Sequence, residues 1–134
     1  MNPNEIQITN VFVREVGQQT MDDTVSWVAG NSEIVAVCTV GAIENAKPVP
    51  PNPAINVQAA IWDHVNGGLL TGAPIPLAFA LAVPDGANEN RTYEATAGLP
   101  NLGAGPGGVY EPVVTLTRGT TITSHYRGPM FVGI

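Results

Sequence analysis

Four side chains of types that bind metal ions are spread along the sequence: Cys38, His64, His125 and Met130. Copper proteins with a β-sandwich fold use this set, but their cysteine lies close to the histidine and methionine ligands near the C-terminus. Here Cys38 lies far ahead of His125 and Met130. Neither histidine has a second ligand two or four residues away, as is typical of zinc sites. We therefore expect no metal site and no cofactor.

Catalysis by a nucleophile would need a serine or cysteine, a base and an orienting acid. Ser124 and His125 are neighbours in a strand-like run, so their side chains point to opposite faces. Cys38 lies in an apolar run with no base or cation nearby, which indicates a small buried hydrophobe. No pair among the eleven acidic residues is singled out for glycoside hydrolysis by two carboxylates. We expect a non-enzymatic protein.

Two loops carry weak signals for ligands. Residues 85–90 gather the oxygen-bearing side chains of Asp85, Asn88, Glu89 and Asn90, which suit calcium, but they lack the EF-hand spacing and favour a polar turn. The glycine-rich residues 103–108 precede neither a helix nor a Lys-Ser/Thr pair, as a phosphate-binding loop requires. Neither loop is taken as a site.

Trp62 gives the clearest indication of binding. Aliphatic side chains alternate along residues 55–62, so Trp62 falls on the polar face of its strand. With Asp63, His64 and Asn66 beside it, this aromatic side chain is suited to stack on a sugar ring or on a partner's side chain. Arg127 and its neighbour Tyr126 are candidates to join this patch. The alternative is that a loop or a second sheet covers the face.

The charge balance excludes other partners. Five Lys and Arg residues stand against eleven Asp and Glu, a net charge of −6, and the basic residues are too scattered for a nucleic-acid surface. No apolar run approaches the roughly 18 residues of a membrane-spanning helix. The first five residues have neither the positive nor the apolar region of a signal peptide. This predicts a cytoplasmic protein, part of a particle assembled in the cytoplasm, or a mature fragment.

Strands must position these residues, because the apolar period is two rather than 3.6. Strand-like runs occur at residues 5–13, 25–29, 33–40, 55–62, 76–83, 91–97, 113–117, 120–126 and 130–134. The run 33–40 is apolar on both faces, as in a strand that is covered on both sides. Asn66-Gly67-Gly68, between residues 55–64 and 69–70, predicts a tight hairpin turn. Residues 18–23 are compatible with one helical turn.

The apolar C-terminal tail and two leucines of a long loop predict self-association. The C-terminal tail carries Met130, Phe131, Val132 and Ile134, which could pair with a neighbour's sheet edge or form the last strand of this chain's own sheet. Leu99 and Leu102 lie in a long glycine-rich loop and could anchor it to the body or to another subunit. The proline-rich residues 46–54 predict a stiff crossover between sheets, or a segment offered to a partner.

These observations predict a single all-β domain over residues 1–134, an antiparallel sandwich of about seven to nine strands, either immunoglobulin-like or jelly-roll. The spacing of strands and turns resembles immunoglobulin-like and fibronectin-like sandwiches, without the Cys…Trp…Cys pattern, and implies architecture alone. Our first hypothesis is a structural module of a virion, tail or surface appendage, forming homo-oligomers or binding another particle protein. The second is a lectin-like module that binds a glycan.

Overall fold

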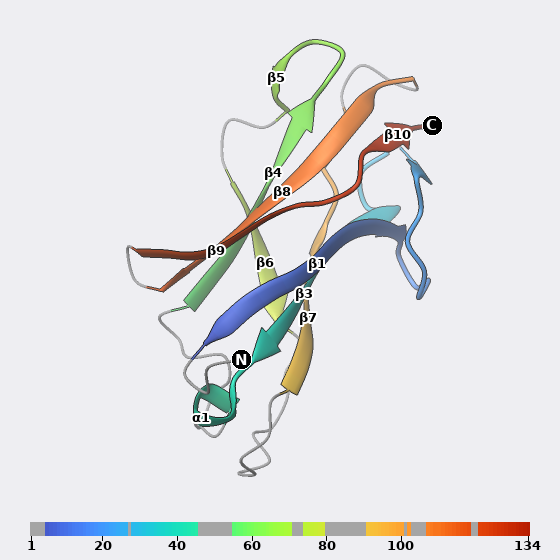
Figure 1. Ribbon diagram of the computed structural model, residues 1–134. Helices are drawn as coiled ribbons and strands as arrows, with labels where there is room; N and C mark the ends of the chain where they lie inside the picture. Colours follow the sequence, from blue (N-terminus) through green and yellow to red (C-terminus); the bar gives the residue numbers. More distant parts are fainter. Residues whose placement is uncertain are drawn as a thin grey trace.

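The computed structural model describes residues 5–26, 28–45, 55–70, 74–79, 91–100, 102, 107–118 and 121–134. Within them the chain is almost entirely β, which confirms the predicted class (Figure 1). The elements are β1 (Ile6–Glu15), β2 (Thr24–Val25), β3 (Ser32–Val40), α1 (Ala42–Asn45), β4 (Ile55–Asp63), β5 (Gly68–Leu69), β6 (Ile75–Phe79), β7 (Arg91–Gly98), β8 (Val109–Arg118), β9 (Thr121–Arg127) and β10 (Phe131–Gly133). No helix among the described residues is long and apolar enough to cross a membrane.

The strands form a sandwich of two layers that are joined at β6. Their order is β1-β3-β7-β6-β4-β8-β10-β2, with β5 added beside β4 and β9 beside β8. Residues 75–77 of β6 pair with β4, whereas Ala78 and Phe79 pair with β7. The first layer is therefore β1, β3 and β7, and the second contains β4, β8, β9 and β10. The pairings are antiparallel except that β10 and β2 run parallel.

On the side away from β6, the two layers begin to close toward a barrel. The backbone N–H of Ile8 in β1 donates to Oγ of Ser124 in β9 at 3.1 Å. Gly128, just after β9, donates its N–H to the Pro112 carbonyl and is buried close to Val11 of β1. The layers are thus connected through β6 on one side and through the contacts of β1 with Ser124 and Gly128 on the other. These two connections fix the distance between the layers.

The core lies between the layers, and the predicted alternation supplies it. On β4, the inward side chains are the expected Val57, Ala59 and Ile61, and all three are buried. The inward side chains of β3 and β8 complete the centre: Ile34, Ala36, Cys38, Val40, Tyr110, Val114 and Leu116. Each large apolar side chain removed from water in this way contributes about 1.5–3 kcal/mol.

The outer face of the first layer carries a cluster of three charged side chains. Arg14 in β1 pairs with Glu33 in β3 at 2.7 Å and with Glu94 in β7 at 3.0 Å. Val35, opposite Phe12 in the register, is fully buried although it lies on this outer face. The prediction that residues 33–40 are covered on both sides is therefore confirmed at Val35.

The tail is a strand of this chain's own sheet. In β10, Phe131 lies opposite Tyr110 of β8, and Val132 lies opposite Thr24 of β2. Phe131 is only 2% exposed, and its ring centroid lies 5.6 Å from that of Tyr110. The N–H of Ile134 donates to the Val25 carbonyl at 2.7 Å.

Of the two alternatives for the tail, the structure shows a strand of this chain's own sheet, and the loop leucines are anchored to the body; self-association itself stays a prediction. Leu99 and Leu102 are core residues, and the Leu102 carbonyl accepts a hydrogen bond from the Tyr110 hydroxyl at 3.0 Å. Phe131 is also core, because β10 continues the sheet beside β8. Of the six predicted contact residues, Met130 and Ile134 are exposed and Val132 is half-buried.

Other expectations are corrected locally. β8 begins at Val109 rather than at residue 113, and α1 was not expected. Residues 18–23 contain no helix; the N–H of Gln18 closes a turn on the Glu15 carbonyl at 3.1 Å. The proline-rich segment, the oxygen-rich residues 85–90 and, in the glycine-rich loop, residues 101 and 103–106 lie outside the described residues.

Candidate functional site

The outer face of the second layer is built from side chains that alternate with the core. Register places Trp62 of β4 opposite Glu111 of β8, in the same row on this face. His64 follows two residues after Trp62 and shares its face. Arg127 of β9 lies opposite Val113, one step further along β8. We call Trp62, His64, Glu111 and Arg127 the Trp62 site.

Glu111 organises this site. Its side chain is only 10% exposed; one oxygen accepts a hydrogen bond from Arg127 Nε, and the other lies 3.0 Å from His64 Nε2. Burial alone raises the pKa of a carboxyl group, but the hydrogen bonds from His64 and Arg127 outweigh it and lower the pKa of Glu111. The carboxylate is therefore ionised at neutral pH. Because a carboxylate only accepts hydrogen bonds, His64 carries its proton on Nε2 in this contact.

The other members of the site face solvent. Trp62 is 37% exposed, and the side chains of His64 and Arg127 are 33% and 63% exposed. An aromatic ring, an imidazole and a guanidinium group thus lie on one surface around a carboxylate that both polar groups contact. This arrangement can bind a ligand by stacking and hydrogen bonding, and it holds neither a nucleophile nor a second carboxylate.

Asp63 and Asn66, which we expected beside the ligand, instead build the hairpin turn. Asp63 points to the opposite face from Trp62; its Oδ1 accepts the N–H groups of Val65 (2.9 Å) and Asn66 (3.1 Å). Its Oδ2 accepts the Asn66 side-chain amide at 3.0 Å. The Asn66 backbone N–H and amide, with the Val65 N–H and the nearby His64, lower the pKa of Asp63. Gly67 has φ +66°, which confirms the predicted turn.

Sequence reasoning thus brought Trp62 and His64 to one face, and Arg127 joins them as expected. Tyr126, its neighbour, is half-buried against the core instead. Glu111 was missed, because the predicted strand began only at residue 113 and left Glu111 outside it. The available signal was a single acidic residue that alternates with apolar neighbours between residues 109 and 113.

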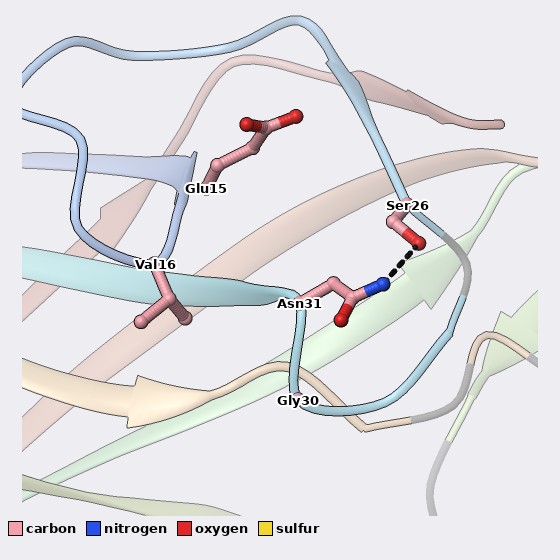
Figure 2. A pocket seen from close by; sticks show the side chains of 5 residues that line it. All are labelled: Glu15, Val16, Ser26, Gly30 and Asn31. Carbon is pink, nitrogen blue, oxygen red and sulfur yellow. Dashed lines mark hydrogen bonds between the residues drawn. The ribbon is translucent and has the colours of Figure 1, made fainter.

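A hollow of about 350 Å³ lies away from the Trp62 site, where β1 ends and β3 begins. Figure 2 shows its lining residues: Glu15, Val16, Ser26, Gly30 and Asn31. Asn31 Nδ2 donates to Ser26 Oγ at 3.2 Å, and the same oxygen accepts the Val28 N–H. Among the lining residues that the structure describes, Glu15 alone is titratable.

The four candidate metal ligands stay apart. Cys38 is buried in the core, and burial raises the pKa of its thiol to about 12. The two histidines lie on the outer face of the second layer, where His125 Nδ1 is 3.3 Å from Thr115 Oγ1. Across the residues that the structure describes, no three His, Cys, Asp or Glu side chains group as a metal site would.

The molecule is thus a β-sandwich domain with a charged, aromatic outer face on one layer. No protein-family model matches its sequence, and a search of curated proteins finds no relative. Among solved structures, a chain described as a beta-galactosidase from Bacteroides fragilis is 15% identical, with a TM-score of 0.49. The match covers 96% of this chain but 17% of that one.

A beta-glucuronidase from glycoside hydrolase family 2 is also 15% identical, with a TM-score of 0.43; 95% of this chain and 12% of that one are covered. This chain therefore spans less than a fifth of either protein. At such values the likeness carries no information on function.

Proposed function

We propose that this chain is a non-enzymatic module that binds carbohydrate at the Trp62 site. The observation that carries the proposal is an exposed tryptophan in the same row as a buried carboxylate that contacts both His64 and Arg127. The proposal uses only side chains of the outer face of the second layer.

Sugars are recognised by this combination of groups. The C–H face of a pyranose ring is apolar and stacks on an aromatic ring, whereas its hydroxyl groups need hydrogen-bonding partners at fixed positions. Glu111 contacts Arg127 and His64 before a ligand arrives, so less side-chain entropy is lost on binding. Trp62 supplies the stacking surface beside them.

The alternative is a self-assembling structural module of a virion, tail or surface appendage. It has less support, because three of the six residues that motivated it, Phe131, Leu99 and Leu102, are buried in this chain's own core. Met130 and Ile134 are the exposed apolar positions of the tail that still favour it.

A glycan array followed by titration calorimetry tests the binding proposal. We expect the wild-type chain to bind at least one glycan, and Trp62→Ala to weaken that binding by about tenfold or more, since loss of a stacking aromatic removes of the order of 1 kcal/mol beyond its buried area. Met21→Ala is the control, because Met21 is also an exposed apolar residue but lies outside the site. No array signal, or equal affinity of wild type and Trp62→Ala, would remove the proposal.

A further inference from the structure

The outer face of the second layer continues well beyond the Trp62 site. One row further along, Ala60 lies opposite Val113, and two rows further, Gln58 lies opposite Thr115. His125 of β9 extends this last row, since it lies opposite Thr115. The four residue steps from Trp62 to Gln58 span roughly 14 Å of extended strand. This distance exceeds the width of one sugar ring.

The side chains between the two rows are small. Ala60 and Val113 are both half-buried and have short side chains, so among the described residues of β4 and β8 the row between Trp62 and Gln58 carries no long side chain. Gln58 and His125 are exposed. The far row therefore offers amide, hydroxyl and imidazole groups for hydrogen bonds, at a distance from the aromatic ring.

The charges along this surface balance. Glu111 is paired with Arg127, and the far row of Gln58, Thr115 and His125 carries no carboxylate or guanidinium group. Thr115 Oγ1 and His125 Nδ1 are within 3.3 Å of each other, which orients the imidazole ring. A neutral ligand rich in hydroxyl groups matches this surface better than an acidic or a basic polymer.

We propose that the site takes a linear, neutral oligosaccharide of several sugar rings, which stacks on Trp62 and runs over Ala60 and Val113 to Gln58 and His125. This inference rests on the proposed function, because it specifies the ligand of the same site. The proposal gives Gln58 and His125 the role of contacting the ligand. Neither side chain is needed for the hairpin turn after β4 or for the core. Trp62 anchors every ligand, and the far row acts only on long ones.

The test measures affinity against chain length. The probes are ladders from monosaccharide to hexasaccharide made from cellulose, xylan, mannan, galactan and chitin, with a polygalacturonate ladder as the acidic comparison. We expect the affinity for at least one neutral ladder to rise beyond the monosaccharide and then level off. Gln58→Ala and His125→Ala should each weaken binding of the longer members by roughly three- to tenfold, as loss of one hydrogen bond predicts, and leave the shortest bound member unchanged.

The controls separate this inference from the proposed function. Gln7→Ala is matched to Gln58→Ala, because Gln7 is an exposed glutamine on the outer face of the first layer, and it should bind every probe like wild type. Equal affinity for short and long members, with no effect of Gln58→Ala, overturns the extended site while the proposed function stands. Preference for polygalacturonate overturns the neutral ligand. Absence of binding to every ladder and to the array overturns both proposals.

Discussion

At the scale of single residues, Glu111 shows how a buried charge is used on a sheet face. Removing a carboxylate from water is costly unless both of its oxygens are engaged. His64, in the turn after β4, and Arg127, in β9, meet that requirement from the two sides of β8. The same contacts that make the charge tolerable also position the two side chains that we assign to the ligand.

Asp63 makes the fold sensitive to acid. Its folded-state pKa is lowered from the ordinary 3.8, chiefly by the Asn66 N–H, and that of Glu111 is lowered from 4.5, because its partners outweigh burial. A group whose folded pKa is depressed stabilises the fold above its unfolded pKa, and this stabilisation is lost as the pH falls through the folded pKa. We therefore expect the free energy of unfolding to fall as the pH decreases below these ordinary values.

Urea unfolding between pH 6 and pH 2 measures this dependence. Asp63→Asn should show a shallower loss of stability on acidification than wild type, because one of the two depressed carboxyl groups is gone. Glu15→Gln, at an exposed carboxylate, is the control and should keep the wild-type slope. Parallel curves for Asp63→Asn and wild type would show that the Asp63 turn contributes no pH-dependent stability.

At the scale of elements, β8 explains why a proline can lie inside a strand. The Pro112 carbonyl accepts the Gly128 N–H, so the edge of β8 that faces β9 and β10 carries both this carbonyl and the missing N–H of Pro112. On that edge, β10 pairs with residues 109–110 and β9 with residues 113–118. Pro112 lies in the interval between these two partners, where no ladder donor is needed.

The pairing of β4 with β8 shows which part of the structure could be predicted from the sequence and which could not. Local alternation correctly placed Val57, Ala59 and Ile61 inward and Trp62 outward, because the period of a strand is a property of its own residues. His64 and Glu111 are separated by 47 residues, and no local pattern selects one for the other. The hydrogen bonds of the site depend on which strands pair and in which register, so neither these bonds nor the part of Glu111 in them could be predicted.

At the scale of the whole molecule, Gly128 is a point where the two layers meet. A Cβ atom at this position would lie 2.8 Å from the Val11 carbonyl oxygen and 2.9 Å from Pro112 Cγ. Backbone and a rigid ring cannot move aside cheaply, so we expect Gly128→Ala to destabilise the fold by about 1–3 kcal/mol.

Chemical denaturation with matched glycine variants measures this close approach. At Gly98 a Cβ atom meets nothing within 4 Å, so Gly98→Ala should change stability by less than about 0.5 kcal/mol. A Gly128→Ala variant that is as stable as Gly98→Ala would mean that the layers can separate at this side without loss.

The tail gives a second prediction at this scale. Deleting residues 130–134 removes the buried Phe131 ring and uncovers Tyr110 and Val25, so we expect loss of the folded state rather than a folded monomer. Circular dichroism and light scattering on the full and shortened chains measure this. Met130→Ala, at an exposed position, is the control and should fold normally. A shortened chain that is a folded monomer, beside a full chain that is an oligomer, would restore the tail as an assembly contact.

The pairing of strands that are distant in the sequence has a consequence for the order of folding. Hairpins such as β8–β9 join residues that are close in sequence, whereas β4–β8 and β3–β7 join distant segments, and loop closure makes such steps slow. We therefore expect Trp62 and Glu111 to meet late in folding, when β4 docks on β8. Ligand binding would then report completion of folding, and saturating ligand would slow or suppress unfolding of the entire domain.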